Sequence, residues 1–221
     1  MQPDPCPPAQ EIRFLDASLR KVSPASAPVA GYSTVIATTA LGLPVLPRWC
    51  VWIQPSTGVE PDRWELRWLT AVRSALTTWD RELSLIRVDS PARANVVIER
   101  RRPPRRRLPG GWRASNGSSQ LQVAEVLRGR RWLLEPRVTV LVSPELRAPV
   151  LEATALHELG HAFGLWGHSP ESGDAMAVSQ GQVPVLQLTD RDRSTLRWVY
   201  GQRTRFGRPI TPSGKNSETN P

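Results

Sequence analysis

The segment that most constrains the fold is HELGHAFGLWGHS, which runs from His157 to Ser169 and contains all 3 histidines of the chain. If this segment is helical, His157 and His161 lie one turn apart on the same face. Gly164 stands where such a helix would end, because glycine accepts the left-handed conformation that terminates helices. The chain after Gly164 can then turn back and bring His168 toward the other two histidines.

Three imidazoles brought together can bind a metal ion. Histidine is the commonest protein ligand for zinc, and three neutral imidazoles leave a fourth coordination position open to water. Zinc lowers the pKa of that water toward neutrality, and a neighbouring carboxylate can then remove its proton. We therefore expect His157, His161 and His168 to bind one zinc ion. Glu158, next to the first ligand, is the expected catalytic residue, the general base in the attack of water on a peptide carbonyl.

Hydrophobic periodicity around this segment predicts a mixed α/β protein. Apolar residues recur every three or four positions over residues 61–83, which indicates a long helix. A second helix, starting near Leu146 or Pro149 and ending at Phe163, would carry the first two histidines. A third helix is expected over residues 190–200, with Thr189 as its cap. Strands are predicted over residues 49–54, 84–88, 95–99, 120–126 and 137–142, with 120–126 as an edge strand.

Composition divides the 221 residues into three parts. Residues 1–46 are rich in Pro, Ala and Ser, which predicts a partly ordered N-terminal extension. Residues 47–205 carry the helix and strand patterns and form the expected catalytic domain. Residues 206–221 are polar, with Pro, Gly, Ser and Asn, and are expected to be a disordered tail.

The formal net charge of +9 comes almost wholly from arginine. Between Arg100 and Arg107, six arginines are interrupted only by Pro103 and Pro104. This run is interpreted as a solvated loop beside the cleft that favours acidic substrates, with electrostatic binding of a polyanion as the alternative. It lacks the interleaved aromatic residues that stack on bases, so no specific nucleic-acid partner is expected.

The 2 cysteines, Cys6 and Cys50, have neither the spacing of a metal knuckle nor that of a redox pair. They either form one disulfide or both stay free, and the sequence leaves these alternatives open.

In these residues the chain resembles the matrixins, a group of metzincin zinc metallopeptidases. Their signature HExxHxxGxxH matches the order from His157 and Glu158 through His161 and Gly164 to His168. The match departs at one point, because three residues rather than two separate Gly164 from His168. The additional residue falls in the loop after the expected helix, which accommodates an insertion more readily than a helix does.

The resemblance continues downstream of the histidines. Met176 has the spacing of the methionine that metzincins place in a tight turn beneath zinc, the Met-turn, although Val178 stands where some members have tyrosine. The sequence LTDRDRSTLRWVYG, residues 188–201, is similar to the matrixin C-terminal helix. The resemblance implies that Asp192 supports the Met-turn.

The resemblance covers roughly residues 48–201 and implies a metzincin-like zincin fold. That fold has a twisted mixed sheet with an antiparallel edge strand, a long backing helix, an active-site helix and a small C-terminal subdomain with the Met-turn and a final helix. It also implies a zinc-dependent metalloendopeptidase whose protein or peptide substrate lies extended along the edge strand, here residues 120–126.

Some matrixin features have no counterpart in this sequence. The loop that holds structural zinc and calcium in that family corresponds to the arginine-rich residues 100–113, so one catalytic zinc ion and no calcium are expected. Cys6 lies in PDPCPP, which lacks the PRCGxPD order of the family's inhibitory cysteine switch.

Two alternatives to a metalloendopeptidase remain open. One is a zinc hydrolase of small amides whose third ligand is Glu171 or Asp174 instead of His168. The other is a non-catalytic protein that binds a metal or a polyanion.

The localisation signals point in different directions. The resemblance favours export, whereas the start MQPDPCPP lacks the pattern of a signal peptide. No transmembrane segment is expected. The protein is expected to be a monomer.

Overall fold

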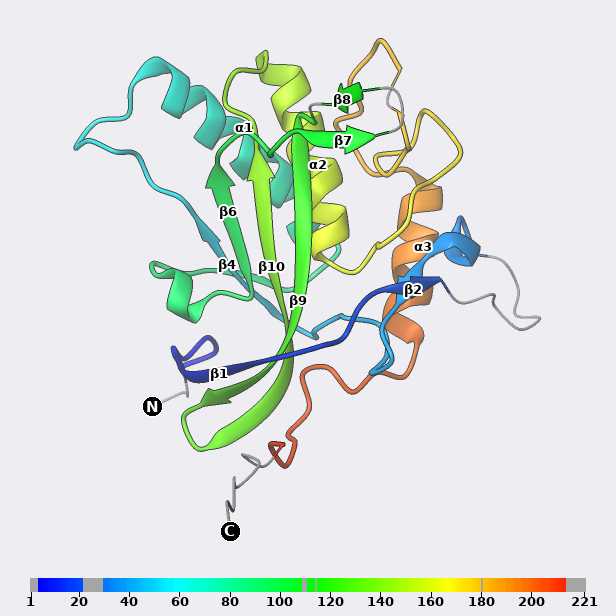
Figure 1. Cartoon of the computed structure of the whole chain (residues 1–221). Helices are drawn as coiled ribbons and strands as arrows, with labels where there is room; N and C mark the ends of the chain where they lie inside the picture. Colours follow the sequence, from blue (N-terminus) through cyan, green and yellow to red (C-terminus); the bar gives the residue numbers. More distant parts are fainter. Residues whose placement is uncertain (1–3, 22–29, 109–110, 114, 180, 214–221) are drawn as a thin grey trace.

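The computed structural model describes residues 4–21, 30–108, 111–113, 115–179 and 181–213. Its centre is a six-stranded mixed sheet with the strand order β1-β9-β10-β6-β4-β5 (Figure 1). Four neighbouring strands are parallel, and β9 is antiparallel to both of its neighbours. The strands are β1 (Ala9–Leu15), β4 (Trp49–Ile53), β5 (Leu85–Arg87), β6 (Val96–Arg100), β9 (Gly117–Arg128) and β10 (Arg131–Val142).

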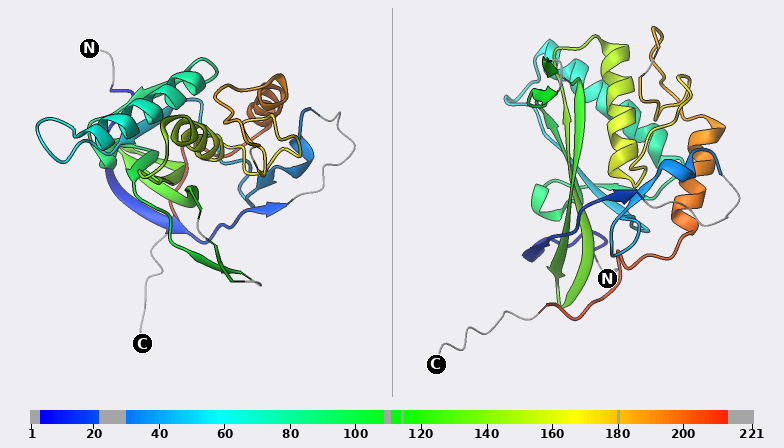
Figure 2. Two further views of the ribbon diagram at one scale, coloured as in Figure 1. Left: turned by 90° about the horizontal axis from the view of Figure 1, so that it is seen from above. Right: turned by 45° about the vertical axis from the view of Figure 1, so that its right-hand side comes forward.

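Helices α1 (Arg63–Asp80) and α2 (Ala148–Ala162) cover one face of this sheet, and α3 (Asp190–Gly201) lies beside α2 (Figure 2). Two buried tryptophans of α1 hold the layers together. The Nε1 of Trp79 donates to the Leu156 carbonyl at 3.0 Å, and the Nε1 of Trp68 donates to the Val142 carbonyl at 3.1 Å. Each ring thus buries a large apolar surface while its only polar atom stays hydrogen-bonded. The predicted mixed α/β architecture and its three helices are confirmed.

Smaller elements complete the described chain. They are the 3-10 helices η1 (Ser33–Val35) and η2 (Pro91–Arg93), the ribbon of β2 (Arg20–Lys21) with β3 (Ala37–Thr38), and the ribbon of β7 (Arg106–Leu108) with β8 (Gly111–Arg113). No described helix is long and apolar enough to cross a membrane.

The N-terminal segment is built into the sheet and the core. β1 pairs with residues 123–128 of β9, and Tyr32 and Ile36 are buried in the main core together with Leu43, Val45 and Leu46. The edge-strand prediction for residues 120–126 is therefore wrong for residues 123–126, because β1 covers them. The signal for β1 was the alternation of Ile12 and Phe14 with charged residues, in a segment whose Pro and Ser content favoured an extension.

A disulfide between Cys6 and Cys50 ties the chain before β1 to β4. Of the two alternatives for the cysteines, the structure has the disulfide, and neither thiol is free to bind a metal as a cysteine switch would. Closing a loop between residues 44 positions apart stabilises the fold by about 4 kcal/mol in the chain-entropy model.

The beginning of the predicted C-terminal tail lies on the sheet. Phe206 is buried, the Ile210 N–H donates to the Trp132 carbonyl at 2.9 Å, and the Ser213 hydroxyl donates to Glu125 at 2.8 Å. Residues 214–221, the remainder of that predicted tail, lie outside the described residues.

Candidate metal centre

Helix α2 presents its apolar and histidine residues on different faces. Leu156, Leu159 and Phe163 are fully buried against the core, whereas His157 and His161 face the other way. The predicted one-turn spacing therefore places two imidazoles side by side.

Between these two histidines, Gly160 lets α2 lie close against Met176 and Trp79. A side chain at this position would put its Cβ only 2.1 Å from the Met176 sulfur and 3.0 Å from the Trp79 ring. Met176, which is fully buried, thus packs directly beneath the turn of helix that carries His157 and His161. Gly160 could not be recognised from the sequence, because its role depends on Met176, 16 positions away.

α2 ends as the sequence predicts. Gly164 has φ of 108°, its N–H donates to the His161 carbonyl, and the Leu165 N–H donates to the Gly160 carbonyl. These two bonds form a Schellman motif, which satisfies the last carbonyls of the helix and reverses the chain. The reversal starts the loop that returns His168 to α2.

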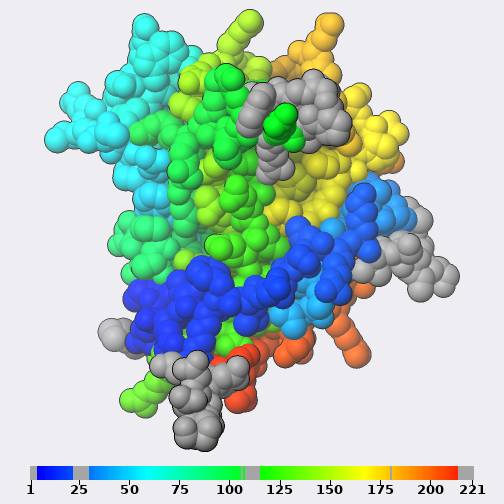
Figure 3. Space-filling model, in the orientation of Figure 1, coloured from blue at the N-terminus to red at the C-terminus, as the bar shows by residue number. Residues whose placement is uncertain are grey.

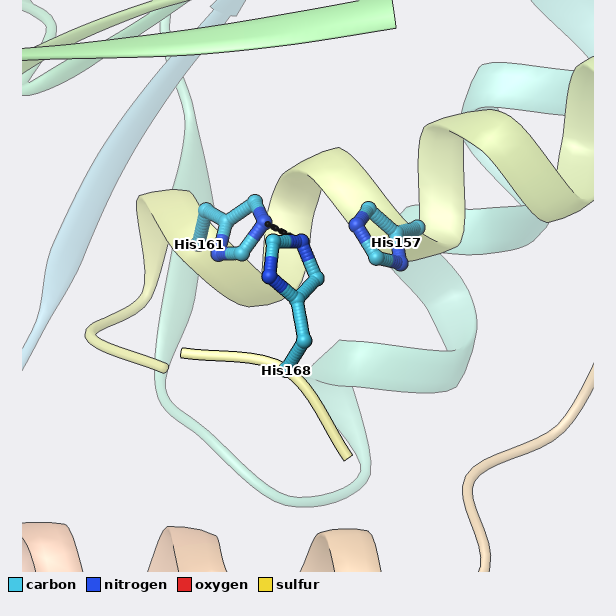
Figure 4. A group of neighbouring side chains, drawn as sticks. All are labelled: His157, His161 and His168. Atoms are coloured by element: carbon cyan, nitrogen blue, oxygen red, sulfur yellow. Dashed lines mark hydrogen bonds between the residues drawn. The ribbon is translucent and has the colours of Figure 1, made fainter. Parts of the chain in front are cut away.

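The structure brings His157, His161 and His168 together (Figure 4). One ring nitrogen from each lies within 4.8 Å of the others, and the Nε2 atoms of His161 and His168 are 3.2 Å apart. Three nitrogens this close can share a single ion. The group could therefore hold a metal, with His157 and His161 supplied by α2 and His168 by the loop.

Backbone carbonyls orient the two helical imidazoles. The Nδ1 of His157 lies 2.9 Å from the Ala175 carbonyl, and the Nδ1 of His161 lies 2.7 Å from the Leu165 carbonyl. Because a carbonyl only accepts, Nδ1 carries the proton in both rings and Nε2 keeps its lone pair. Such contacts are the usual means by which proteins orient metal-binding histidines.

Burial keeps the imidazoles neutral. It lowers the pKa of His157 to about 4 and that of His161 to about 3, and partial desolvation of the more exposed His168 also lowers the pKa of that ring. All three rings are therefore neutral at pH 7, each with a single N–H. Because metal binding requires the neutral form of histidine, the donor set fits a divalent cation.

Asp192, on α3, connects to His157 through one residue. Its Oδ2 accepts from the Ala175 N–H at 2.9 Å, and the Ala175 carbonyl accepts from His157. Its Oδ1 accepts from the Tyr32 hydroxyl at 2.8 Å. Asp192 is fully buried and also closes the capping box with Thr189. No local signal in the sequence points to Tyr32, because 160 positions separate it from Asp192.

Glu171 and Asp174, the alternative third ligands, are not in the histidine group among the described residues. The Asp174 carboxylate accepts hydrogen bonds from Ser169, Thr189 and Arg191. Burial alone would raise the pKa of Asp174, but these hydrogen bonds lower it below its usual value. Asp174 therefore holds together the loop after His168 and the start of α3.

Glu158 is held by β9. The Ser119 hydroxyl lies 2.8 Å from the Glu158 Oε2 and 2.8 Å from its backbone carbonyl. A Cβ on Gly117 would approach the Glu158 side chain to 2.6 Å, so the absence of a side chain there makes room for Glu158. Neither Ser119 nor Gly117 was identified from the sequence, because only strand pairing brings them to α2.

The loop with the additional residue is clamped from two sides. The Ala37 N–H donates to the Trp166 carbonyl at 2.9 Å, and a Cβ on Gly167 would lie 2.4 Å from the Val35 carbonyl. On the other side, the Ser169 N–H donates to the Met176 carbonyl at 2.8 Å. The N-terminal segment thus packs on the loop that carries His168.

No protein-family model and no curated protein sequence matches this chain.

The three histidines and Glu158 line one cavity of about 920 Å³. A second cavity of about 360 Å³ shares His157 and Glu158, and its wall includes Thr154 and Val178. The centre therefore lies at the meeting point of two hollows, where an extended ligand can reach it from either side.

The arginine run differs from the predicted solvated loop at its start. Arg100 forms a 2.6 Å ion pair with Glu65, and both side chains are only 9% exposed. Arg101 pairs with Glu99 and Arg102 with Glu145. Pro103 and Pro104 line the larger cavity, so the run does pass beside the cleft.

Proposed function

We propose that this protein is a zinc-dependent metalloendopeptidase of the metzincin, matrixin-like type. One observation carries the proposal: three neutral imidazoles converge on a common point, and the carboxylate that follows the first of them is hydrogen-bonded to a strand beside the cleft. Three histidines leave a coordination position for a substrate or water, which is the pattern of catalytic rather than structural zinc sites.

His157, His161 and His168 would hold the ion. When bound, zinc lowers the pKa of water and polarises a peptide carbonyl. Glu158 takes the proton of the attacking water, whose oxygen bonds to the carbonyl carbon, and delivers that proton to the amine as the C–N bond breaks. Ser119 orients the Glu158 carboxylate during this transfer. The substrate backbone pairs with residues 117–122 of β9, the part that β1 leaves uncovered.

Three further features support the matrixin-like assignment. Met176 packs beneath the turn that carries two of the histidines. Asp192 bonds to the residue that orients His157. Contacts from the N-terminal segment and from Met176 hold the loop that is one residue longer than the family pattern.

The proposal is tested with a fluorogenic peptide library and the full chain, before and after removal of metal. We expect cleavage by the protein loaded with one zinc ion per chain, loss of cleavage on chelation and its return on adding zinc. Cleavage that is indifferent to chelation, or a zinc-loaded protein that cleaves no peptide, would overturn the proposal.

A further inference from the structure

The free edge of β9 is short, and β1 sets its length. Leu15 pairs with Val123, and the ladder continues to Ala9 opposite Arg128. Among the described strands, none pairs with the outer side of residues 117–122. Ser119 lies beside Glu158 within this stretch, so only residues 120–122 separate the catalytic carboxylate from the covered part of the strand.

Beyond β1, the N-terminal segment continues to the cleft. Leu19, Lys21 and Val35 line the same 920 Å³ cavity as the three histidines and Glu158. In Figure 3 this segment, in blue, crosses the face as a band below the exposed yellow residues of α2 and its loop. The cavity is therefore bounded at this end, whereas toward Gly117 it continues into the second cavity, which Thr154 and Val178 line.

Charge distinguishes the bounded end as well. Among the described residues that line the larger cavity, Lys21 is the only cationic side chain and Glu158 the only acidic one. Lys21 is exposed and forms none of the ion pairs found among the described residues. A lysine at a cleft wall attracts a carboxylate and repels a cation.

We propose that this cleft pairs with about three substrate residues on the amino side of the cleaved bond and prefers an acidic side chain among them. The inference rests on the proposed peptidase function. A peptide that adds to β9 in the antiparallel sense, as β1 and β10 do, has its amino side toward residue 122. Substrate residues farther from the cleaved bond cannot pair with β9, because β1 already occupies that part of its edge.

The first experiment is a series of peptides lengthened one residue at a time on the amino side. We expect kcat/KM to rise up to the third residue and then to stay level. The Kd of the same peptides for the zinc-loaded Glu158→Ala variant, measured by fluorescence polarisation, should follow the same course without any cleavage. A continued rise beyond the third residue in both measurements would overturn the limit on length.

The second experiment reverses the charge at the bounded end. For the wild-type protein, we expect peptides with Glu on the amino side to be cleaved about two- to fivefold faster than peptides with Lys, and Lys21→Glu should reverse this order. Arg20→Glu is the matched control, because Arg20 is an exposed neighbour on β2 that does not line the cavity. An unchanged order in Lys21→Glu, or an equal change in Arg20→Glu, would overturn the charge preference.

Two results distinguish a failure of the proposed function from a failure of this inference. If the zinc-loaded wild-type protein cleaves no peptide, the proposed function itself fails, and this inference fails with it. If it cleaves peptides without regard to amino-side length and charge, only the inference fails.

Discussion

The candidate metal centre has two halves that are built differently. His157 and His161 come from one helix, and their backbone positions follow from helical geometry. His168 is exposed and comes from a loop, which contacts from residues 35–37 and from Met176 hold in place. The positions of two ligands therefore depend on local sequence, whereas the position of the third depends on long-range packing.

The largest difference between the halves should appear on removing one ligand from each. His161→Ala removes an imidazole whose position the helix has already set, so we expect zinc affinity to fall about 1,000-fold. His168→Ala removes an exposed imidazole whose loop is ordered only by tertiary contacts, so we expect a smaller loss, about 100-fold. Competition with a chromophoric chelator measures both. Equal losses would contradict the distinction.

Gly164 joins the two halves, and its substitution should disturb the loop more than the helix. In Gly164→Ala, the residue must keep φ of 108°, and its Cβ would lie 2.4 Å from the Val45 side chain. We expect the free energy of unfolding to fall by about 1–3 kcal/mol, measured by urea denaturation. Gly173→Ala is the control, because no atom lies within 4 Å of a Cβ there. A loss of the same size in the control would show that neither the backbone strain nor the contact with Val45 is responsible.

Loss of the contact between Tyr32, in the N-terminal segment, and Asp192 should have a smaller effect on zinc affinity. This effect would act through His157, on α2. Tyr32→Phe removes the hydroxyl that donates to Asp192, which in turn positions Ala175 and His157. We expect zinc affinity to fall about tenfold. Tyr200→Phe is the matched control, because the Tyr200 hydroxyl bonds to Trp49 and Phe163 and to none of the histidines. If both variants bind zinc with equal affinity, Tyr32 has no positioning role.

Local signals were enough to predict most of the elements that carry the centre. The periodicity of α1 and α2, the cap at Thr189 and the glycine that ends α2 all act within a few residues, so they can be recognised without the fold. The same holds for the spacing of His157 and His161. The long-range position of His168 was expected only because Gly164 allows the chain to reverse.

The features that escaped prediction depend on residues far apart in the chain. Ser119 reaches Glu158 only because β9 lies beside α2, and 39 positions separate the two residues. β1 was hidden by the Pro-rich composition around it, and its pairing shortened the predicted edge strand. The cysteine spacing allowed a disulfide or free thiols, and only the packing of β1 against the sheet brings Cys6 to Cys50.

We propose that the three histidines hold zinc and that Glu158 performs the proton transfer. The most direct test compares the wild-type protein with Glu158→Ala for zinc content, by elemental analysis, and for hydrolysis of one cleavable peptide. We expect one zinc ion per chain in both proteins and a loss of kcat of about 100-fold or more in the variant. Hydrolysis at the wild-type rate by a zinc-loaded Glu158→Ala variant would show that Glu158 is not the general base.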